Sequence, residues 1–540
     1  MRLSAYRLTR RACLIAAACL AAPGLRGAAR AQAPAAPSTT VLTTPDDAVV
    51  LVRSLNSLRT ARGSGFLIGD GGWVVTASHV VSADLGKGQR AFDPTVLVYV
   101  PWTGRPYEAR VTAVDGTADI ALLRLPEAGF PALPLEGLDL KDAAPALAAL
   151  KDRPLRLFGF PLTYGEGTVA ALAKPERNDA RLSQVAKRDQ INLCVLTPCP
   201  DAQPGWSGGP MVSTDRGAVV AVFHSLYRPS PNEKTVYPAG SLTGYLADLL
   251  RRARVTDVER FTRVAAPSVP RPAGAAERMA REMRSLAWCA DGRWGKAEEE
   301  QRDIIKAAPE DGLAHMELGR ILLMAQKPEA ALKELETAAR LAPKSVFAQL
   351  YLGRAHHLGY DYRAAVAALR AAGAASPAEV EPQLVLAEVH EENQKPAEAE
   401  AVLRSALQSA SSHPGLLCRL GNLLVKQGKP DEGFKLLAQA AELAEADPGL
   451  SYIGLSRARG LELARKHKDA ETAYRATLRV DPDNLMARYY LAALCLRLNK
   501  VEDAQVQVNA AFRASHLPES LVEAFRALQA RINEKGTAGK

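Results

Sequence analysis

The stretch Gly205-Trp206-Ser207-Gly208-Gly209-Pro210 places one serine hydroxyl among small residues. Glycines allow a tight backbone bend, in which main-chain N–H groups can point at a substrate oxygen beside that hydroxyl. The stretch therefore indicates a nucleophilic serine, Ser207. Gly-Ser-Gly strings are also common in surface turns, so the stretch alone leaves both interpretations open.

Short β-branched runs surround this turn, from about Asp46 to Tyr237, and Gly, Pro and Asp separate them. Many short strands at regular spacing predict an all-β sandwich or barrel. A helix is predicted only for residues 241–254, where leucines gather on one side. The predicted strands are Ala48–Val52, Ser64–Ile68, Trp73–Ala77, Val96–Val100, Ala109–Val114, Ile120–Leu125, Leu155–Phe158 and Val219–Phe223.

Two histidines, His79 and His224, lie in this half of the chain, so few residues could act as a base for Ser207. His79 is the better candidate, because small residues before it let an imidazole at a strand end reach across a cleft. Asp119 opens an apolar strand, where an unpaired charge costs several kcal/mol, so it must be paired or hydrogen-bonded. Taken singly, His79 could be a half-buried histidine and Asp119 a turn residue.

Three motifs in this order resemble those of the trypsin/chymotrypsin-like serine peptidases: Thr-Ala-x-His at His79, Asp-Ile-Ala-Leu-Leu at Asp119 and Gly-x-Ser-Gly-Gly-Pro at Ser207. The nearest resemblance is to bacterial HtrA-type peptidases, through Gly63-Ser64-Gly65-Phe66 and the Gly159-Phe160-Pro161 turn. The resemblance covers about residues 45–255. It implies an all-β double-barrel peptidase domain over this range.

The resemblance also implies a role for each site residue. Ser207 would attack a peptide carbonyl, His79 would take and return its proton, and Asp119 would hold the imidazole. The N–H groups of Gly205 and Ser207 would form the oxyanion hole. The substrate would be a protein or peptide cleaved by way of an acyl-enzyme, and neither a cofactor nor a metal is expected.

One residue departs from the family pattern. Trp206 stands where these peptidases usually carry Asn or Asp, so its indole must either pack under the loop or shield the serine. A shielding indole would distort the oxyanion hole. The missing Asp also removes the usual partner of a freed amine, so no activation by cleavage near Ser64 is expected.

The sequence encodes substrate preference poorly. Asp201 lies six residues before Ser207, where trypsin-like peptidases place the base of the P1 pocket, and an acid there would favour Arg or Lys. The HtrA-like alignment instead leaves an apolar pocket bordered by residues 221–224, with His224 as a pocket-wall or core residue. Cys194 and Cys199 are close enough in sequence for a disulfide, and two small buried thiols are the alternative.

The first residues predict export. Arginines precede the apolar run Ala12–Ala22, and small residues follow, as in a secretory signal over residues 1–31. The run is too short to span ~30 Å of hydrocarbon, so no stable membrane span is expected. Arg10-Arg11 resembles a twin-arginine signal, although ordinary signals also hold paired arginines. Residues 32–44 predict an extended tether, and the location would be periplasmic or secreted.

The second half has a different pattern, after a Pro-rich linker at 256–275. Small residues recur every 34 positions, with three extra residues between Gly421 and Ala458, and a second small column follows each by 12 positions. This period resembles the tetratricopeptide repeat, in which small residues let paired helices approach closely. Six clear units and one degenerate unit span 276–517, and 518–540 would form a capping helix and tail. The columns are Gly319, Gly353, Ala387, Gly421, Ala458 and Ala492, then Ala331, Ala365, Ala399, Gly433, Ala470 and Ala504.

A stripe one position after the first small column should face the concave groove of such an array. It is polar and partly basic, so it could bind an acidic or C-terminal carboxylate-bearing segment of a protein partner. A solvated face is the alternative. The stripe consists of Arg320, Arg354, Glu388, Asn422 and Arg459.

Composition narrows the functional classes. The chain has 540 residues and a formal net charge of +9, which no compact Lys/Arg stripe concentrates, so nucleic acid is not an expected partner. The leading hypothesis is an exported serine endopeptidase whose repeats recruit a substrate or partner. The alternative hypothesis is an inert peptidase-fold scaffold whose repeats bind proteins. The oligomeric state does not follow from the sequence.

Overall fold

The structure is a computed structural model that describes most of the chain after the tether. The predicted signal segment and the tether before Thr44 lie outside the described residues. The described residues are 44–55, 61–85, 90–161, 174–188, 190–197, 205–228, 235, 237–264, 266–445, 450–514 and 517–538.

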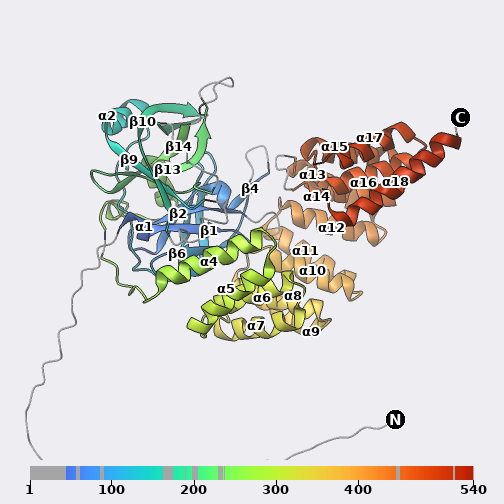
Figure 1. Ribbon diagram of the computed structural model, residues 1–540, viewed down its shortest axis with the longest axis horizontal. Helices are drawn as coiled ribbons and strands as arrows, with labels where there is room; N and C mark the ends of the chain where they lie inside the picture. The colour runs from blue at the N-terminus through green and yellow to red at the C-terminus, as the bar shows by residue number, and fades with distance from the viewer. Residues whose placement is uncertain are drawn as a thin grey trace, which may run out of the picture. The chain divides into compact units, whose positions relative to one another are not determined.

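Two closed antiparallel β-barrels form the first half of this part of the chain (Figure 1). The first barrel has the strand order β1-β2-β3-β8-β7-β6, and the second has the order β10-β11-β14-β13-β12-β9. All eight predicted strands fall within these barrels, so the double-barrel prediction is confirmed. The first contains β1 Val49–Arg53, β2 Arg62–Ile68, β3 Trp73–Thr76, β6 Thr95–Val100, β7 Arg105–Asp115 and β8 Ile120–Arg124. The second contains β9 Pro154–Gly159, β10 Glu176–Arg188, β11 Ile191–Leu196, β12 Pro210–Ser213, β13 Ala218–Tyr227 and β14 Tyr237–Leu242.

Four barrel strands, β10, β11, β12 and β14, and several short elements were not predicted from the sequence. Strand β10 buries only Ala180 and Ala186, so its sequence lacks the apolar alternation that marks a strand. The other elements outside the barrels are short, except for the predicted helix α3. They are α1 Pro45–Ala48, the 3-10 helix η1 Ser78–Val80, the paired strands β4 Ser82–Asp84 and β5 Arg90–Phe92, α2 Ala143–Leu150, α3 Thr243–Arg252 and η3 Glu259–Thr262.

The predicted Pro-rich linker is attached to the first barrel. Phe261 is fully buried, and its backbone carbonyl accepts a hydrogen bond from Leu135 N at 2.7 Å. Further along, the Val269 carbonyl accepts a hydrogen bond from Trp102 Nε1 at 2.8 Å. The segment therefore runs along the barrel surface before the helices begin.

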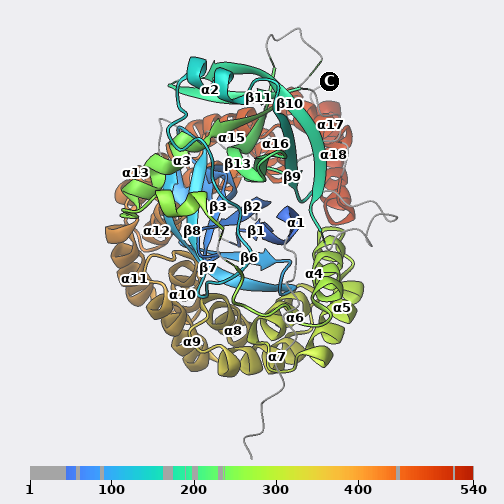
Figure 2. The same cartoon turned by 90° about the vertical axis from the view of Figure 1, so that its left-hand side faces the viewer.

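Seven consecutive helix pairs follow within the described residues, and Figure 2 shows them succeeding one another in sequence order. A terminal helix then follows the seventh pair. The pairs are α4 Ala275–Ala290 and α5 Trp294–Ala307, α6 Gly312–Met324 and α7 Pro328–Leu341, α8 Val346–Leu358 and α9 Tyr362–Ala375, α10 Glu381–Glu392 and α11 Pro396–Ser409, α12 Pro414–Lys426 and α13 Pro430–Leu443, α14 Ser451–Leu463 and α15 His467–Val480, and α16 Leu485–Arg497 and α17 Val501–Phe512. The terminal helix is α18 Glu519–Ala538.

The small-residue columns lie where the two helices of a pair come closest. A Cβ built on Gly319 would come within 2.4 Å of Leu335 Cγ, and one on Gly353 within 2.6 Å of Leu369 Cγ. Ala331 and Ala365, in the second column, are fully buried. Close helix approach thus explains the 34-residue period, as predicted.

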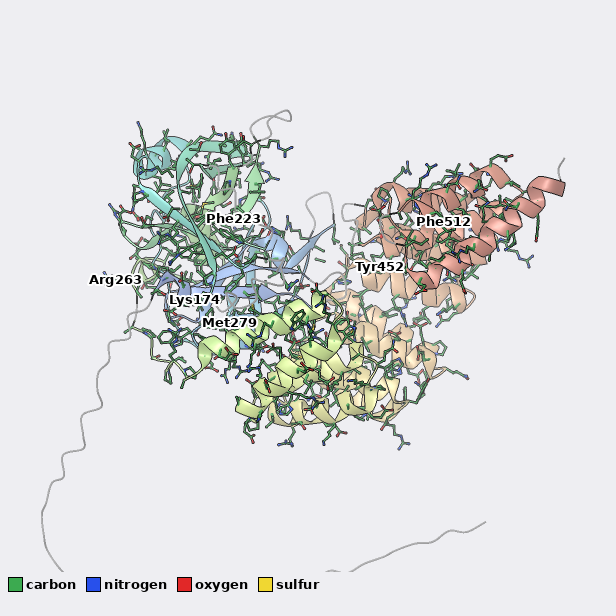
Figure 3. The ribbon with its side chains drawn as sticks, viewed as in Figure 1. Lys174, Phe223, Arg263, Met279, Tyr452 and Phe512 are labelled. Atoms are coloured by element: carbon green, nitrogen blue, oxygen red, sulfur yellow. The ribbon has the colours of Figure 1, made fainter. Side chains whose placement is uncertain are left out.

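The first helix pairs and the first barrel share one hydrophobic core. Met279 on α4 (Figure 3) is buried in the same apolar cluster as strands β1, β6 and β7. Glu108 on β7 accepts hydrogen bonds from Val346 N at 3.1 Å and Phe347 N at 3.2 Å. These N–H groups open α8 and have no partner within the helix, so a barrel carboxylate caps a helix of the array.

A buried ion pair strengthens the same contact. Arg53 on β1 donates to Glu317 on α6 at 2.9 Å, and their side chains are only 6% and 2% exposed. Arg320 pairs with the same carboxylate at 2.9 Å. Charges this deeply buried must be matched, so the contact between barrel and array is specific in position.

The helix spacing predicts a difference between two glycine substitutions. Gly319→Ala places a methyl group against Leu335, whereas Gly295→Ala on α5 meets nothing within 4 Å. Both variants gain helix propensity, so the overpacking cost of about 1–3 kcal/mol should separate them. Urea unfolding followed by far-UV circular dichroism measures this difference. Equal midpoints for the two variants would contradict the close approach of α6 and α7.

Candidate active site

His79 and Asp119 meet at the ends of two paired strands of the first barrel. His79 lies in η1 just after β3, and Asp119 immediately precedes β8, which pairs with β3. His79 Nδ1 lies 2.8 Å from Asp119 Oδ2, and the backbone N–H of His79 donates to Oδ1 at 3.0 Å. The carboxylate therefore fixes both the backbone and the ring of the histidine.

The Asp119 carboxylate is held by several donors in a confined site. The Ser78 hydroxyl donates to Oδ1 at 2.7 Å, in addition to the two contacts with His79. The backbone of Asp119 has φ 53°, a left-handed conformation that is uncommon for a residue with a side chain. Burial acts to raise the pKa of Asp119, but its hydrogen bond and charge interaction with His79 outweigh burial, so the pKa is lowered. The group is a carboxylate at neutral pH.

The Ser207 turn is attached to both barrels. The Ser207 carbonyl accepts from Ser64 N on β2 at 2.7 Å, and Gly208 N donates to the carbonyl of Phe223 on β13 at 2.7 Å. Gly208 has φ 92°, and a Cβ there would come within 2.7 Å of Ala77 N, two residues before His79. The turn therefore lies against the segment that carries the histidine.

Ser64 is a residue of the candidate site that the sequence did not single out. Its hydroxyl donates to the Gly205 carbonyl at 2.8 Å and accepts from Phe160 N at 2.7 Å. Gly63-Ser64-Gly65 and Gly159-Phe160-Pro161 were noted only as shared motifs. Their common role is to hold the backbone of the serine turn from both sides.

Trp206 packs beneath the turn. Its side chain is 1% exposed, and a Cβ on Gly159 would come within 2.4 Å of the indole Cγ. Of the two alternatives for this residue, the structure has the packed one, so the indole does not cover Ser207. Gly205 has φ 99°, and within the described residues the N–H groups of Gly205 and Ser207 donate to no acceptor.

Comparisons with known proteins agree with this geometry. Residues 63–222 match the trypsin-like peptidase domain family. Residues 290–346, 317–377, 359–414 and 455–518 match the tetratricopeptide repeat. The chain joins a trypsin-like peptidase domain to tetratricopeptide repeats.

Two serine proteases are similar to about a third of this chain. Mitochondrial serine protease HTRA2 of Bos taurus is 34% identical, over 30% of this chain and 31% of the relative. A probable periplasmic serine endoprotease, DegP-like, of a Marinomonas species is 27% identical, over 32% and 31%. The chain thus spans about a third of the length of these relatives. Among solved structures, the chain is similar to the crystal structure of Rv3671c protease in an inactive form, with 22% sequence identity and a TM-score of 0.27. The match covers 39% of this chain and 90% of the Rv3671c chain.

His224, predicted as a pocket-wall or core residue, is buried behind the carboxylate of Asp119. Its Nδ1 is 3.7 Å from Asp119 Oδ2, its Nε2 is 3.2 Å from Ser241 Oγ, and its side chain is 3% exposed. Burial lowers its pKa to about 4, against the opposing charge of Asp119. The ring is neutral at neutral pH.

The predicted disulfide does not form in the structure. Cys194 on β11 is a free thiol, fully buried among the apolar side chains of the second barrel. Burial raises its pKa to about 12, so the sulfur stays protonated. Its predicted partner, Cys199, and the predicted pocket acid, Asp201, lie outside the described residues. The other described cysteines, Cys289, Cys418 and Cys495, are free thiols, as expected.

The predicted groove residues of the repeat array do not form one continuous site. Three of them, Arg320, Arg354 and Glu388, line a cavity of about 740 Å³. Arg53, Leu55 and Arg62 of the first barrel close one side of this cavity. Elsewhere, Asn422 donates to Cys418 Sγ at 3.6 Å, and Arg459 donates to Tyr490 OH at 2.9 Å. The barrel therefore takes part in the groove, which the sequence did not predict.

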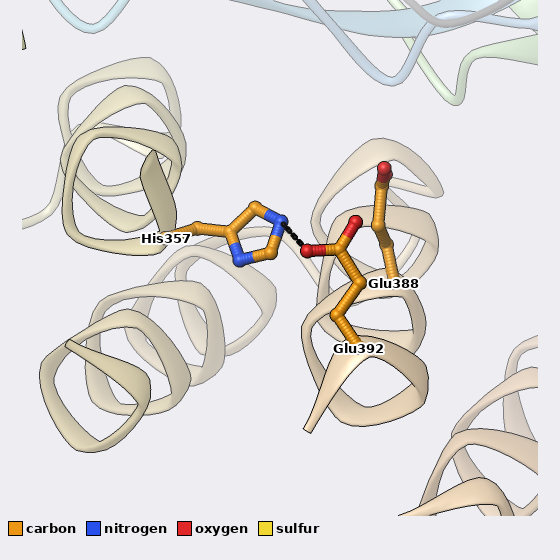
Figure 4. Close-up of side chains that lie close together, drawn as sticks. All are labelled: His357, Glu388 and Glu392. Atoms are coloured by element: carbon orange, nitrogen blue, oxygen red, sulfur yellow. Dashed lines mark ion pairs between the residues drawn. The ribbon is translucent and has the colours of Figure 1, made fainter. Parts of the chain in front are cut away.

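Two clusters in the described part of the array could hold a metal ion, since their ligand atoms lie within 4.8 Å of one another. In the first cluster (Figure 4), His357 Nε2 already pairs with Glu392 at 3.3 Å, and Glu392 is exposed. In the second, both carboxylates pair with neighbouring cations. Internal ion pairs account for both clusters, so we assign them no metal. The clusters are His357, Glu388 and Glu392, and Glu471, Cys495 and Asp503.

The buried His224 predicts a pH dependence of stability. Its pKa is about 4 in the folded state and about 6.5 in an unfolded chain, so the folded state binds fewer protons between these values. The stabilisation is present above pH ~6.5 and is lost as the pH falls toward 4. Between pH ~6.5 and 4, the free energy of unfolding of His224→Gln should fall by roughly 3 kcal/mol less than that of the wild type. Urea unfolding followed by tryptophan fluorescence measures this difference. Identical pH slopes for variant and wild type would show that His224 titrates normally.

Proposed function

We propose that this chain is an exported serine endopeptidase in which His79, Asp119 and Ser207 form a catalytic triad. The observation that carries the proposal is the 2.8 Å contact between His79 Nδ1 and Asp119 Oδ2, with the Ser207 turn fixed against the same strand end. The match to the trypsin-like peptidase domain and the serine protease names of the relatives support it.

The geometry suits acyl transfer. Ser207 Oγ attacks the peptide carbonyl carbon while its proton passes to His79 Nε2, and Asp119 holds the Nδ1–H side of the ring. The negative oxygen that develops is bound by the N–H groups of Gly205 and Ser207. When the C–N bond breaks, His79 gives its proton to the amine. Water then attacks the acyl-enzyme by the same route in reverse and restores Ser207.

The packing of Trp206 supports this proposal over the inert scaffold. A shielding indole was the main reason to expect an inactive site, and the side chain instead packs between Gly159 and the core of the second barrel. The side chain of His79 is 36% exposed and Ser207 is half-buried, so solvent and substrate can reach both.

Export is part of the proposal. The predicted signal over residues 1–31 supports it, as does the periplasmic name of a relative. No helix among the described residues is both long and apolar enough to cross a bilayer. The free thiol of Cys194 is compatible with an oxidising compartment, because burial and its raised pKa limit its reactivity.

A fluorophosphonate probe tests the proposed nucleophile. The wild type should be labelled, and Ser207→Ala should not be labelled, because the probe needs an activated serine. Asp119→Asn should lower the labelling rate about 10³–10⁴-fold, since the carboxylate fixes the imidazole tautomer. Folding of each variant is checked by circular dichroism. If the wild type is folded and is not labelled, the inert peptidase-fold scaffold becomes the better hypothesis.

We further propose that the 740 Å³ cavity receives a segment of a protein substrate or partner. Arg354 and Glu388 line it beside the barrel residue Arg62, so a bound segment would lie next to the peptidase domain. Arg354 also lies over the ring of Tyr351 at 5.7 Å, so its guanidinium is held in a fixed position at the cavity. Arg354 lies on α8 and Glu388 on the neighbouring helix α10, so the two can contact opposite charges along an extended segment.

Two arginine variants test this cavity. Arg354→Ala should raise KM several-fold for an unfolded protein such as reduced casein, because a charge-assisted contact is lost. It should leave KM unchanged for a short chromogenic peptide, which is too small to reach the array. The matched control is Arg459→Ala, which removes an arginine that does not line the cavity. Equal effects on both substrates would contradict recruitment through this cavity.

A further inference from the structure

A two-stranded ribbon leaves the first barrel directly after the candidate base. Strands β4 and β5 pair with each other, and β4 begins two residues after η1, the helix that holds His79. Figure 1 shows β4 extending from the barrel on the side of α12 to α14. The ribbon is not part of either barrel.

The ribbon is seated in the repeat array. Its apolar residues Ala83, Leu85 and Ala91 are buried in one cluster with residues of α12, α13 and α14. Leu437 on α13 and Ile453 on α14 are fully buried members of that cluster. This core holds no residue of the two barrels, so the apolar residues of the ribbon are buried against the array.

Arg90, the first residue of β5, reaches back from the ribbon to the candidate site. Its Nη1 donates to Ser78 Oγ at 3.0 Å and to Ser82 Oγ at 3.1 Å. A Cβ on Gly116 would come within 3.0 Å of Arg90 Nε, so the guanidinium lies close against the loop before Asp119. The side chain is thus fixed at both its charged end and its flank.

Ser78 connects this guanidinium to the candidate triad. Its hydroxyl accepts from Arg90 and donates to Asp119 Oδ1 at 2.7 Å. A hydroxyl has a single proton, so a cationic donor on its lone pair directs that proton toward the carboxylate and strengthens the second bond. Asp119 in turn holds His79.

We propose that Arg90 is a positioning residue of the triad, acting through Ser78 on Asp119, and that the repeat array sets its place through the β4–β5 ribbon. This inference rests on the proposed peptidase function. It gives the array a second role besides recruitment, because packing changes at α12 to α14 reach the catalytic carboxylate through one side chain.

A double-mutant cycle tests the link through Ser78. Arg90→Ala should lower kcat about tenfold with KM unchanged, the size expected for a lost hydrogen bond to a charged group. In a Ser78→Ala background the same substitution should have almost no further effect on kcat, because the hydroxyl that connects Arg90 to Asp119 is already absent. Additive effects, or an unchanged kcat in Arg90→Ala, would overturn the proposal.

Two further readouts separate positioning from general damage. Loss of a cation near Asp119 favours protonation of the base, so the acid limb of the pH–rate profile should move to higher pH in Arg90→Ala. Arg90 also lines a cavity of about 680 Å³, so added guanidinium ion should restore part of kcat. The matched control is Arg124→Ala, which removes an arginine paired with Asp70 on the same barrel and should change none of these.

The contribution of the array is tested in its own core. Leu437→Ala in the ribbon cluster should lower kcat and cause little further loss when combined with Arg90→Ala. Leu491→Ala, equally buried in the cluster of the last repeats, should destabilise the array without changing kcat. If both leucine variants lower kcat alike, the ribbon does not transmit the effect and this part of the proposal fails.

Failure of this inference is distinguishable from failure of the proposed function. Wild type that labels with fluorophosphonate but is insensitive to Arg90→Ala refutes only the positioning role. If the wild type does not label, proton NMR of the His79 Nδ1–H resonance still reports the link. The resonance should shift in Arg90→Ala and in Ser78→Ala, and an unmoved resonance in both variants overturns the inference without any turnover.

Discussion

A buried carboxylate must have its hydrogen bonds satisfied, and Asp119 imposes this requirement on the whole candidate site. Ser78 and His79 supply donors to its two oxygens, and the Ser78 N–H also donates to its carbonyl at 3.2 Å. The left-handed backbone of Asp119 is held by these bonds and by the paired β3 and β8 strands. Strain of this kind persists only where the surroundings over-determine it, as they do here.

The sequence predicted the parts of the structure that local patterns encode. Each repeat must pack two helices closely, so small residues such as Gly319 recur at the repeat period and reveal the array. The pairing of His79 with Asp119 followed from motifs around each residue. Strand β10 was missed because its side chains are largely exposed. Cys194 was predicted to form a disulfide with Cys199, but its position on β11 places its side chain in the core of the second barrel.

Tertiary contacts between distant segments could not be predicted in the same way. Nothing near Arg90 in the sequence indicates that its guanidinium reaches Ser78, because a separate core in the array places the ribbon. The same holds for Arg53 and Glu317, whose pairing depends on how barrel and array dock. Removing one partner of such a buried pair leaves an uncompensated charge, which is costly, so the docking is fixed in register. The peptidase domain and the array are therefore joined by a buried ion pair and a common hydrophobic core, in addition to the chain that connects them.

The separation between Arg53 and Glu317 also has a consequence during synthesis. The two residues are 264 positions apart, and ribosomes add about 5–20 residues per second. For roughly 10–50 s, the first barrel exists without the carboxylate that balances its buried arginine and without the helices that cover the same face. The barrel is translated first, but it can reach its final packing only after α6 has emerged, so the order of folding along this chain runs partly against the order of translation.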